Sequence, residues 1–481
     1  MRSISFTRCR DESAQFLPSF LLALCLVAPA SNAEPASDMA VSVVRASKPI
    51  PEQYIVTFKE GVSVRLPDAV TRAGGREGLR YDSIPAIAVR LPAAALEALR
   101  RHPGVEAIEE DGIVQLSGVK PAANNTSPGN TASDLWGLDV IDRSTQCRNN
   151  QYFAYTGTGS GVRIYVMDGG VRPDHSEFLA GGATRVVSTD STLKQVLNTF
   201  ITQTYGSPTG DYYRIPSSAC WVSSPDDLKA SHGTAVASLA AGKDFGIASG
   251  AAVVDARTFP CNGDSTIAVV NKALEWIPTD PAYTSGPRIL NMSFEFSIYN
   301  DGTGSTAMQS IINNLVSQHN ITVVVAAGNQ PGSVNWTVPA RINSAITVGA
   351  LSKNAGGSVE SIWYHGPHTS GGVTTYIGSG YGAAVDIYAP GQYVESAHHA
   401  YPWKRSLASA CVFNYPAGCT SGTSFATPYV SGMAALYLEQ NPSASPAQVV
   451  AYLQNSSSYT ITDPSGNVRK TLNINSGLSC P

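Results

Sequence analysis

The stretch Gly422-Thr-Ser-Phe-Ala-Thr-Pro428 precedes a run of small and apolar residues that extends to Leu436. A glycine turn here delivers Ser424 to the start of a helix, and Pro428 fits its first turn, where a missing N–H costs little. The helix N-terminus favours an anion that forms beside the Ser424 hydroxyl. Taken alone, the stretch equally fits an ordinary capped helix start, so the rest of the chain must decide.

Composition limits the class of protein. The 481 residues include 32 Lys and Arg against 36 Asp and Glu, so the net charge is −4, and only 14% of residues are charged. Such a chain has no basic surplus for nucleic acid or an anionic membrane. Its length allows roughly two to four domains and a large core. We expect a globular monomer that binds neither nucleic acid nor membrane.

The first 33 residues are typical of an export signal. Arginines precede an apolar run from Phe16 to Ala28, and Ser31-Asn-Ala33 has the small-x-small pattern of a cleavage site. A buried core helix is the alternative, but the segment is terminal and has no partner pattern. The sequence therefore predicts a signal peptide over residues 1–33 and a secreted protein.

Cysteine usage agrees with export. Outside the expected signal the chain has an even number of cysteines and no C-x-x-C motif. In an exported chain this pattern predicts disulfide bonds and disfavours a zinc ribbon or a thioredoxin-type site. Six cysteines allow fifteen pairings, so the connectivity stays open at this point. The six are Cys147, Cys220, Cys261, Cys411, Cys419 and Cys480.

Residues 50–117 read as a unit of their own. Strands are expected over Tyr54–Phe58, Ala86–Leu91 and Val105–Glu109, and a short helix over Pro92–Arg101. A unit of this size buries only a modest core and gains stability by docking onto a partner. A polar stretch rich in Pro, Gly and Asn follows, as in an exposed linker. We expect a propeptide over residues 34–118; the alternative is a permanent N-terminal module.

From about residue 135, strands alternate with helices. The expected strands are Gly161–Met167, Arg288–Ser293 and Ile321–Asn329, and the expected helices are Ala235–Ala241, Thr266–Ile277 and Ala307–His319. Nearly continuous apolar strands are typical of a parallel sheet that is covered on both faces. Functional residues of such sheets lie beyond the carboxyl ends of the strands. Asp168 and Asn329 stand at such ends.

Three residues at the ends of elements together suggest catalysis. Asp168, His232 and Ser424 supply an orienting carboxylate, a general base and a nucleophile, in that chain order. The side-chain amide of Asn329 and the backbone N–H of Ser424 can donate to the oxygen that becomes negative. Each residue alone has an ordinary interpretation as a turn, cap or core residue. Their joint occurrence favours a catalytic site.

The chain resembles the subtilisin family of serine proteases, and in particular its proteinase K branch. The residues that carry the likeness are Val166–Gly170, His232–Ala237, Asn291–Ser293, Val325–Asn329 and Gly422–Pro428, with Leu135–Leu138 resembling the start of the mature enzymes. The resemblance implies an α/β fold with a doubly wound seven-stranded parallel sheet flanked by helices. It further implies a small α+β ferredoxin-like propeptide that inhibits and is removed by self-processing, and an endopeptidase domain over residues 119–481.

Two departures from the family concern the site. Gly169 stands where relatives have Ser or Thr, so we expect weaker orientation of Asp168. The specificity pocket implied by the resemblance is lined by Ser293, Phe294, Glu295, Phe296, Ala326 and Gly328, where relatives have glycines at the positions of Glu295 and Phe296. One hypothesis is that Glu295 favours Lys or Arg before the cut. Local pairing of Glu295 is favoured instead, because self-cleavage near Val114–Gly118 presents a small residue.

Disulfide bonds and calcium are also suggested. The resemblance implies a Cys220–Cys261 bridge; a Cys411–Cys419 bridge would stiffen the approach to Ser424, and Cys147 would then pair with Cys480. The resemblance further implies a structural calcium ion that is bound by Asp386, with the carbonyls of Asn343 and Ala345 as further ligands. It implies no cofactor for the chemistry. Nearby histidines at 365, 368, 398 and 399 lack acidic or thiol partners, which favours surface loops over a zinc site.

Two other functions stay open. Gly169 and the altered pocket leave room for a catalytically impaired subtilase fold that acts as a binding or inhibitory protein. An esterase is disfavoured, because the motif G-x-S-x-G is absent around Ser424 and the Asp precedes the His and the Ser in the chain.

Overall fold

The computed structural model describes residues 40–116, 135–141, 157–188, 192–205, 228–260, 264–283, 285–299, 306–352, 361–370, 373–397, 405–406, 421–457 and 459–473. All of them lie in one compact unit that begins at Ala40. No helix in these ranges is long and apolar enough to cross a membrane. The expected signal and all cysteines lie outside the described residues, so the disulfide pairings stay predictions.

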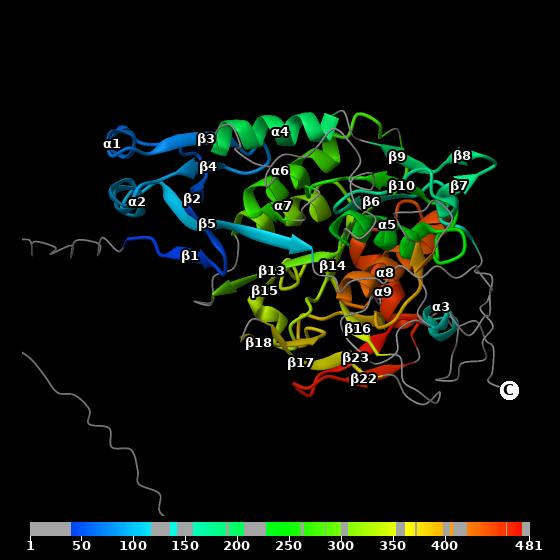
Figure 1. Ribbon diagram of the computed structural model, residues 1–481. Coiled ribbons are helices and arrows are strands. Elements are labelled where there is room, and N and C mark those ends of the chain that lie inside the picture. Colours follow the sequence, from blue (N-terminus) through cyan, green and yellow to red (C-terminus); the bar gives the residue numbers. More distant parts are fainter. Residues whose placement is uncertain are drawn as a thin grey trace, which may run out of the picture. The chain divides into compact units, whose positions relative to one another are not determined.

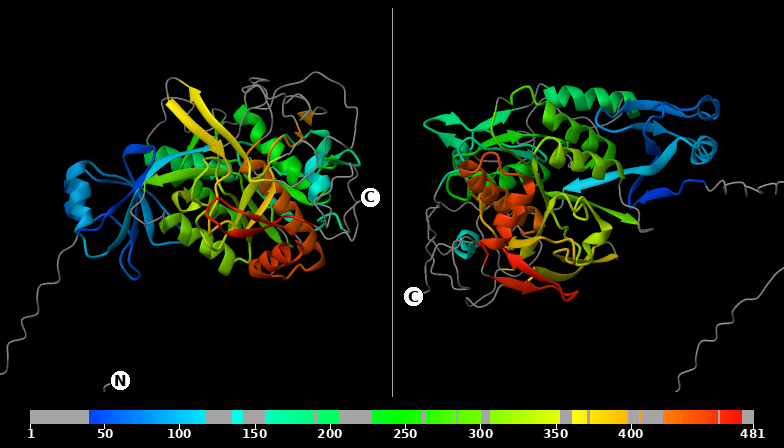
Figure 2. Two further views of the ribbon diagram at one scale, coloured as in Figure 1. Left: turned by 90° about the horizontal axis from the view of Figure 1, so that it is seen from below. Right: turned by 180° about the vertical axis from the view of Figure 1, so that it is seen from behind.

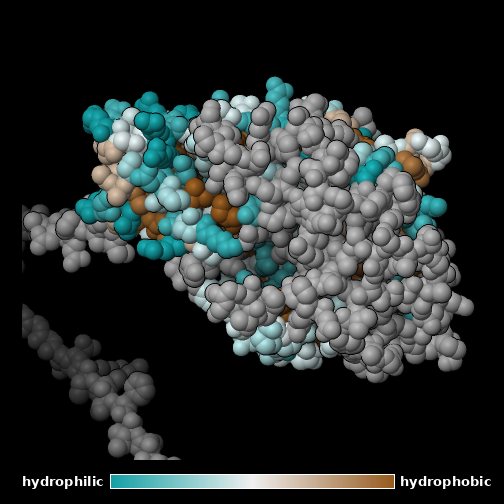
Figure 3. All heavy atoms as spheres, viewed as in Figure 1, coloured by the Kyte–Doolittle hydropathy of each residue, from teal (hydrophilic) through white to brown (hydrophobic). Residues whose placement is uncertain are grey.

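Residues 40–116 form an N-terminal subdomain (Figure 1). Its elements are β1 (Val43–Ala46), β2 (Pro49–Phe58), α1 (Asp68–Arg72), β3 (Arg76–Arg80), β4 (Ala86–Arg90), α2 (Ala93–Arg100) and β5 (Val105–Leu116). Antiparallel pairing in the order β5-β2-β4-β3 is the ferredoxin-like arrangement that the resemblance implies, and β1 adds to β5 in parallel. Hydrophilic side chains cover much of this subdomain in Figure 3, whereas Phe58, Ile87 and Leu99 share a buried core.

The residues from 135 onward, here called the main domain, contain a large twisted sheet. Its strands are β6 (Arg163–Met167), β9 (Val186–Ser188), β10 (Ala252–Asp255), β12 (Arg288–Met292), β14 (Thr322–Ala326), β16 (Ile346–Leu351), β19 (Ile387–Pro390), β22 (Thr460–Thr462) and β23 (Val468–Thr471). The order is β22-β23-β19-β16-β14-β12-β6-β10-β9. The seven strands from β9 to β19 are parallel, which confirms the expected sheet. At one edge β23 continues it in parallel and β22 adds an antiparallel strand.

Helices cover both faces of this sheet (Figures 1 and 2). They are α3 (Trp136–Ile141), α4 (Thr192–Tyr205), α5 (Leu228–Ala241), α6 (Ile267–Trp276), α7 (Thr306–Ser317), α8 (Thr423–Gln440) and α9 (Pro446–Asn455). Within β6, Ile164 and Val166 pack in the hydrophobic cluster of α5 and α8, and Tyr165 and Met167 in that of α4, α6 and α7. Successive side chains of a strand point to opposite faces, so a nearly continuous apolar strand fits between two helix layers.

Two helix starts differ from the sequence prediction. Helix α5 begins at Leu228, so His232 lies within it and not at its start. Helix α8 begins at Thr423, and Pro428 therefore lies inside the helix; its placement in the first turn was wrong. A proline at this position removes the N–H that would donate to the carbonyl of Ser424, four residues earlier. The hydroxyl of Ser293 donates a hydrogen bond to that carbonyl instead.

Strand β5 extends out of its own sheet and enters the main domain. Its end lies between β11 (Asp264–Thr266) and β13 (Phe294–Tyr299), antiparallel to both. Gln115 lies opposite Asp264 on one side and opposite Glu295 on the other. A segment that is distant in sequence thus forms the middle strand of a small sheet at the carboxyl end of β12.

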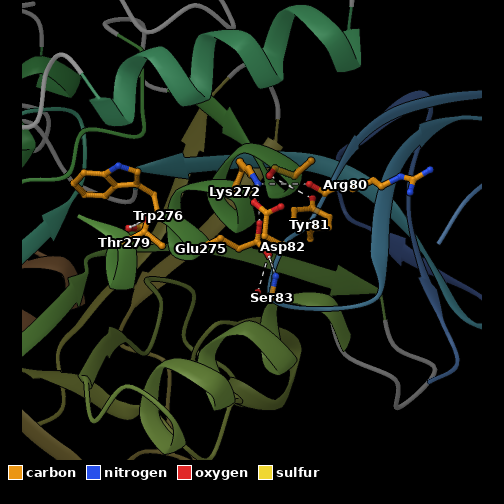
Figure 4. A network of polar contacts seen from close by, with 9 residues as sticks. Arg80, Tyr81, Asp82, Ser83, Lys272, Glu275, Trp276 and Thr279 are labelled. Atoms are coloured by element: carbon orange, nitrogen blue, oxygen red, sulfur yellow. Dashed lines mark hydrogen bonds and ion pairs between the residues drawn. The ribbon is translucent and has the colours of Figure 1, made fainter. Parts of the chain in front are cut away.

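Polar contacts fix the N-terminal subdomain to α6 (Figure 4). Lys272 Nζ lies 2.7 Å from Asp82 Oδ2 and 3.0 Å from Glu275 Oε2. Glu275 Oε1 in turn accepts hydrogen bonds from the backbone N–H and the hydroxyl of Ser83, at 2.6 and 2.7 Å. Lys272 and Glu275 are mostly buried here, so these charges satisfy one another across the contact.

Two carboxylates of β5 lie at helix N-termini. Glu109 Oε1 accepts the N–H of Ala307 in α7 at 2.8 Å, and Asp111 Oδ1 accepts the N–H of Ala268 in α6 at 3.0 Å. The hydroxyl of Tyr205, at the end of α4, also donates to Asp111. Burial raises the pKa of Asp111 to about 6, although these hydrogen bonds oppose the shift. Negative charge at a helix N-terminus is favourable, so these contacts offset part of the cost of burying the two carboxylates between β5 and the main domain.

Candidate active site

Asp168 and His232 form a buried pair. Asp168 directly follows β6 and is fully buried, and the His232 side chain is 5% exposed. His232 Nδ1 lies 2.8 Å from Asp168 Oδ2 and 3.0 Å from Oδ1. The N–H of Gly169 donates to Oδ1 at 2.6 Å, so the main chain supplies a hydrogen bond although the residue has no hydroxyl. The expected weaker orientation of Asp168 stays a prediction.

Gly233 permits the close approach of His232 to Asp168. A Cβ atom at this position would lie 3.0 Å from Asp168 Oδ1 and 2.5 Å from the carbonyl oxygen of Gly170. Any larger residue would therefore push α5 away from the end of β6. Close packing thus accounts for the glycine that follows His232, and neither helix propensity nor charge does.

Ser424 is the second residue of α8 and is fully buried. Its hydroxyl donates to the carbonyl oxygen of Ser293 at 2.9 Å. The ring of the next residue, Phe425, lies 5.3 Å from the His232 ring between centroids. In the part of the chain that the structure describes, His232 Nε2 is buried and has no hydrogen-bond partner. His232 thus lies beside the start of α8 with its Nε2 atom unsatisfied.

A buried polar network lies beneath Ser424. Ser293 Oγ donates to the Ser424 carbonyl at 2.8 Å and thereby replaces the N–H that Pro428 lacks. Asn291 Nδ2 donates to Ser293 Oγ at 2.9 Å, and Ser431 Oγ donates to Asn291 Oδ1 at 2.8 Å. Sequence reasoning missed these positioning roles. The available signal was Pro428 itself, because a proline inside a helix leaves a carbonyl that needs another donor.

Asn329 follows β14 and is held by Thr423, the residue before Ser424. Its Oδ1 accepts the N–H of Thr423 at 2.8 Å and the Thr423 hydroxyl at 2.9 Å. These bonds identify Nδ2 as the donor end of the amide. That nitrogen would lie 3.2 Å from a Cβ on Gly422, whose φ is +148°. Sequence reasoning chose Asn329 and missed the part of Thr423 in orienting it.

The segment from Ser293 to Phe296 does not line a pocket with all its side chains. Phe294 and Phe296 are buried in the hydrophobic cluster of α6 and α7, and Phe294 packs 5.1 Å from the Phe259 ring. Because strand residues alternate, Ser293 and Glu295 point to the other side. The two phenylalanines can therefore offer only backbone to the expected pocket, and Ala326 in β14 is fully buried.

Glu295 is half-buried and pairs with the opposite wall. Its Oε1 accepts the N–H of Asn329 at 2.8 Å, and a Cβ on Gly328 would collide with Oε2. Gly328 has φ +97°, a conformation that also favours glycine. The favoured interpretation of Glu295, local pairing, matches this contact. The Glu295 carboxylate thus lies between the two segments that are expected to form the pocket, residues 293–296 and 326–328.

The expected calcium ligands lie close to one another in the fold. Asp386 directly precedes β19, and its Oδ2 accepts the N–H of Thr347 in β16 at 2.8 Å. Asn343 and Ala345 stand just before β16. Burial raises the pKa of the Asp386 carboxyl to about 6, because it destabilises the ionised form. A cation bound beside the carboxylate would stabilise that ionised form. The residues present therefore fit a calcium ion, whose remaining ligands would be carbonyls and water.

The histidines considered for a zinc site fall where the structure describes no side chains. Among the described residues no group of three or more His, Cys, Asp and Glu side chains is placed to hold a metal ion. His398 and His399 lie outside the described residues, as do the side chains of His365 and His368.

A buried Asp–His pair, a serine at a helix N-terminus and an amide held beside it are the parts that a serine hydrolase requires, and here they lie together beside a doubly wound sheet. Comparison with known families is consistent with this class. Residues 159–474 match the Subtilase family (Peptidase S8), and residues 53–117 match Peptidase inhibitor I9. The chain belongs to the subtilase family of serine peptidases. It carries an inhibitor propeptide, as zymogens of this family do, and the family needs no cofactor for catalysis.

Relatives extend over most of the chain. It is 30% identical over 462 residues to the extracellular serine proteinase of Thermus sp. (strain Rt41A), covering 90% of this chain and 92% of that protein. It is 30% identical to the alkaline serine exoprotease A of Vibrio alginolyticus, covering 88% and 67%. The crystal structure of fervidolysin from Fervidobacterium pennivorans, a keratinolytic enzyme related to subtilisin, has a TM-score of 0.56 at 19% identity, covering 92% of this chain and 64% of that one. That likeness concerns the fold alone.

Proposed function

We propose that this subtilase is a secreted, self-processing endopeptidase in which Asp168, His232, Ser424 and Asn329 carry the catalysis. The observation that carries the proposal is the buried contact of His232 Nδ1 with Asp168, which leaves Nε2 as the base. His232 takes the proton of the Ser424 hydroxyl as that oxygen attacks the substrate carbonyl. Asp168 holds the ring tautomer and stabilises the imidazolium. The serine becomes acylated, and water then releases the acyl group.

Substrate binding frees the nucleophile in this mechanism. The Ser424 hydroxyl donates to the carbonyl of Ser293, at the end of the strand pairing between β5 and β13. A substrate strand in the register of β5 would bring a backbone N–H to the same carbonyl. The hydroxyl would then turn to His232 Nε2, while Asn329 Nδ2 and the N–H of Ser424 stabilise the oxyanion.

We assign residues 1–33 to the signal peptide, 34–118 to the propeptide and 119–481 to the mature domain. Support comes from β5, whose end lies between β11 and β13 with Leu116 opposite Phe294, next to Ser293. A strand in this position both blocks the site and presents the following residues for cleavage near Val114–Gly118. After the cut, the contacts of Glu109, Asp111 and Asp82 hold the propeptide as an inhibitor.

We propose that the pocket for the substrate residue just before the cleaved bond accepts a small side chain. Support comes from Glu295, whose carboxylate bonds to the N–H of Asn329 and occupies space beside Gly328. A calcium ion at Asp386, with the carbonyls of Asn343 and Ala345, is proposed as a stabilising ligand outside the chemistry. The disulfide pairs Cys220–Cys261, Cys411–Cys419 and Cys147–Cys480, and a monomeric state, belong to the same proposal.

N-terminal sequencing and mass measurement of the secreted protein test the main proposal. Wild-type protein should begin just after the Val114–Gly118 segment, and a Ser424→Ala variant should keep its propeptide. A processed Ser424→Ala protein would contradict self-cleavage. Labelling with a fluorophosphonate distinguishes the alternative, an impaired binding or inhibitory protein: it should modify Ser424 in processed wild type, and failure to label would favour the alternative.

A further inference from the structure

Tyr81 of the N-terminal subdomain is buried against the main domain. The residue is 5% exposed and belongs to the hydrophobic cluster of α4, α6 and α7, whereas Phe58 and Leu99 belong to the separate core of the subdomain. Tyr81 directly follows β3, and its N–H donates to the carbonyl of Ala86 at 3.0 Å, which fixes the turn between β3 and β4. This turn therefore presents the tyrosine side chain to the main domain.

Helices α4 and α6 form the site that holds this side chain. We call it the tyrosine socket and define it by Phe200 of α4 with Ala268 and Asn271 of α6. The Phe200 ring lies 6.2 Å from the Tyr81 ring between centroids, and the Tyr81 hydroxyl donates to the carbonyl of Ala268 at 3.4 Å. Burial raises the pKa of the Tyr81 hydroxyl, and Asn271, fully buried one helical turn after Ala268, opposes this shift. An aromatic wall with polar groups for a hydroxyl fits a tyrosine.

Close packing fixes α4 to the subdomain. A Cβ atom on Gly78 in β3 would lie 3.1 Å from Thr204 Oγ1 and 3.3 Å from Thr204 Cα, so a larger residue would push β3 away from α4. The hydroxyl of Tyr205, the last residue of α4, donates to Asp111 in β5. Helix α4 therefore contacts two strands of the subdomain in addition to Tyr81.

The polar contacts beside the socket are more exposed than the tyrosine. In Figure 4 the turn residues 81–83 lie beside Lys272 and Glu275 of α6. The Asp82 side chain, which pairs with Lys272, is 85% exposed. An ion pair with such an exposed partner contributes little to affinity, whereas a desolvated aromatic side chain ringed by polar contacts is typical of an interface hot spot. We therefore expect Tyr81 to contribute more of the binding free energy than Asp82.

The tyrosine socket and the proposed catalytic helices lie on opposite faces of the main sheet. Ile164 of β6 packs in the hydrophobic cluster of α5 and α8, the helices that bear His232 and Ser424. The next residue, Tyr165, points to the other face and packs in the cluster of α4 and α6. A cut in the chain after β5 therefore leaves the contacts of the socket in place.

We propose that the tyrosine socket is an exosite, a binding site outside the catalytic centre, through which the mature enzyme holds its cleaved propeptide by Tyr81. This inference rests on the proposed self-processing of the chain. The partner that the socket fits is a polypeptide that presents a tyrosine on a rigid turn, as the propeptide does. Contacts at the socket do not involve the peptide bond that is cut, so they keep the inhibitor bound after cleavage and set the rate of its release.

The release of the propeptide from the processed complex tests this inference. Full-length wild type, Tyr81→Ala, Tyr81→Phe and Asp82→Ala are allowed to process themselves and are then diluted into a fluorogenic peptide substrate. The rate at which activity appears gives the dissociation rate of the propeptide. Once the propeptide is gone, all four enzymes have the same sequence and must show the same final activity. Thermal unfolding of each uncut chain, with Ser424→Ala added, checks the fold.

Tyr81→Ala should release the propeptide about 30-fold faster or more, the size expected for a hot-spot anchor. Tyr81→Phe should release it about two- to tenfold faster, as expected for one lost hydrogen bond, and Asp82→Ala about fivefold faster or less. An unchanged release rate in Tyr81→Ala, or a larger effect of Asp82→Ala, would overturn the inference. If Tyr81→Ala yields no folded enzyme, Tyr81→Phe and Asp82→Ala are compared in the same way.

A double-mutant cycle with Phe200→Ala separates the socket from a general weakening of the subdomain. Phe200→Ala should speed release in the wild-type background and have a smaller effect beside Tyr81→Ala, because both substitutions remove the same contact. Additive effects would contradict the socket. A wild-type chain that is never cut would instead refute the proposed self-processing, and this inference with it.

Discussion

Ser293 and Ser424 exchange two hydrogen bonds. The Ser424 hydroxyl donates to the Ser293 carbonyl at 2.9 Å, and the Ser293 hydroxyl donates to the Ser424 carbonyl at 2.8 Å. The second bond exists because Pro428 lacks the N–H that would serve that carbonyl in an uninterrupted helix. The pair joins the end of β12 to the start of α8 and positions Ser424, the proposed nucleophile.

Replacing Ser293 by alanine should lower the free energy of unfolding by about 1–3 kcal/mol, because a buried carbonyl loses its donor. A Ser293→Ala/Pro428→Ala variant restores a backbone N–H at position 428 and should regain part of that loss. Chemical denaturation of the four proteins, with Ser424→Ala added to prevent self-digestion, measures the coupling. Additive effects of the two substitutions would contradict the proposed replacement of donors.

Replacing Asn329 by alanine should reduce kcat by about 10²–10³ and leave KM nearly unchanged, a magnitude carried over from the corresponding amide in subtilisin, a member of the same family. Asn329→Asp keeps an oxygen for Thr423 but has no N–H to donate, so it should be similarly slow. Steady-state kinetics on one peptide tests both. Near-normal turnover of Asn329→Asp would remove the amide from the proposed oxyanion site.

Propeptide binding should weaken as the pH rises from 4 to 6. Burial raises the pKa of Asp111 in the complex to about 6, above its ordinary value of 3.8, so binding takes up a proton between these values. Affinity should be highest below pH 4, fall by at most about a hundredfold and level off above pH 6. Asp111→Asn should flatten this dependence. Dissociation of the processed complex, followed by size-exclusion chromatography across this pH range, measures it; an unchanged profile in Asp111→Asn would assign the effect elsewhere.

Replacing Glu295 by glycine should widen the pocket and raise cleavage after large apolar residues about tenfold or more relative to small ones. Glu295→Gln nearly preserves the size of the side chain and serves as the matched control. Cleavage of a peptide library by the three enzymes reads out the preference. A wild-type preference for Lys or Arg that vanishes in Glu295→Gln would revive the charge hypothesis and refute the small-residue pocket.

Calcium should raise the unfolding temperature of the mature enzyme, and chelation should lower it, because a ligand that binds only the folded state stabilises it. Asp386→Asn should abolish the difference between calcium and chelator. A site elsewhere would leave the calcium dependence of Asp386→Asn intact. Activity extrapolated to zero time should be the same with calcium and with chelator, since the ion has no part in the chemistry.

Much of the fold was readable from local patterns. Nearly continuous apolar strands such as β6 and β14 predict a sheet that is buried on both faces, and the two hydrophobic clusters around Ile164 and Tyr165 confirm it. Asp168 and Asn329 stand at strand ends because such sheets gather functional residues there. Pro428 shows the limit of local rules, since its place inside the helix depends on a donor, Ser293, that is far away in the sequence.

The sequence by itself determined the alternation of strands and helices and the propeptide pattern, and it predicts the export signal and the roles of Asp168, His232 and Ser424. These features depend on neighbouring residues and on the periodicity of each element. Only the tertiary structure decided that Glu295 bonds to Asn329, that Ser293 serves the carbonyl of Ser424 and that Tyr81 lies against α4 and α6. Such contacts join distant segments, and the direction of each side chain is set by the packing around it.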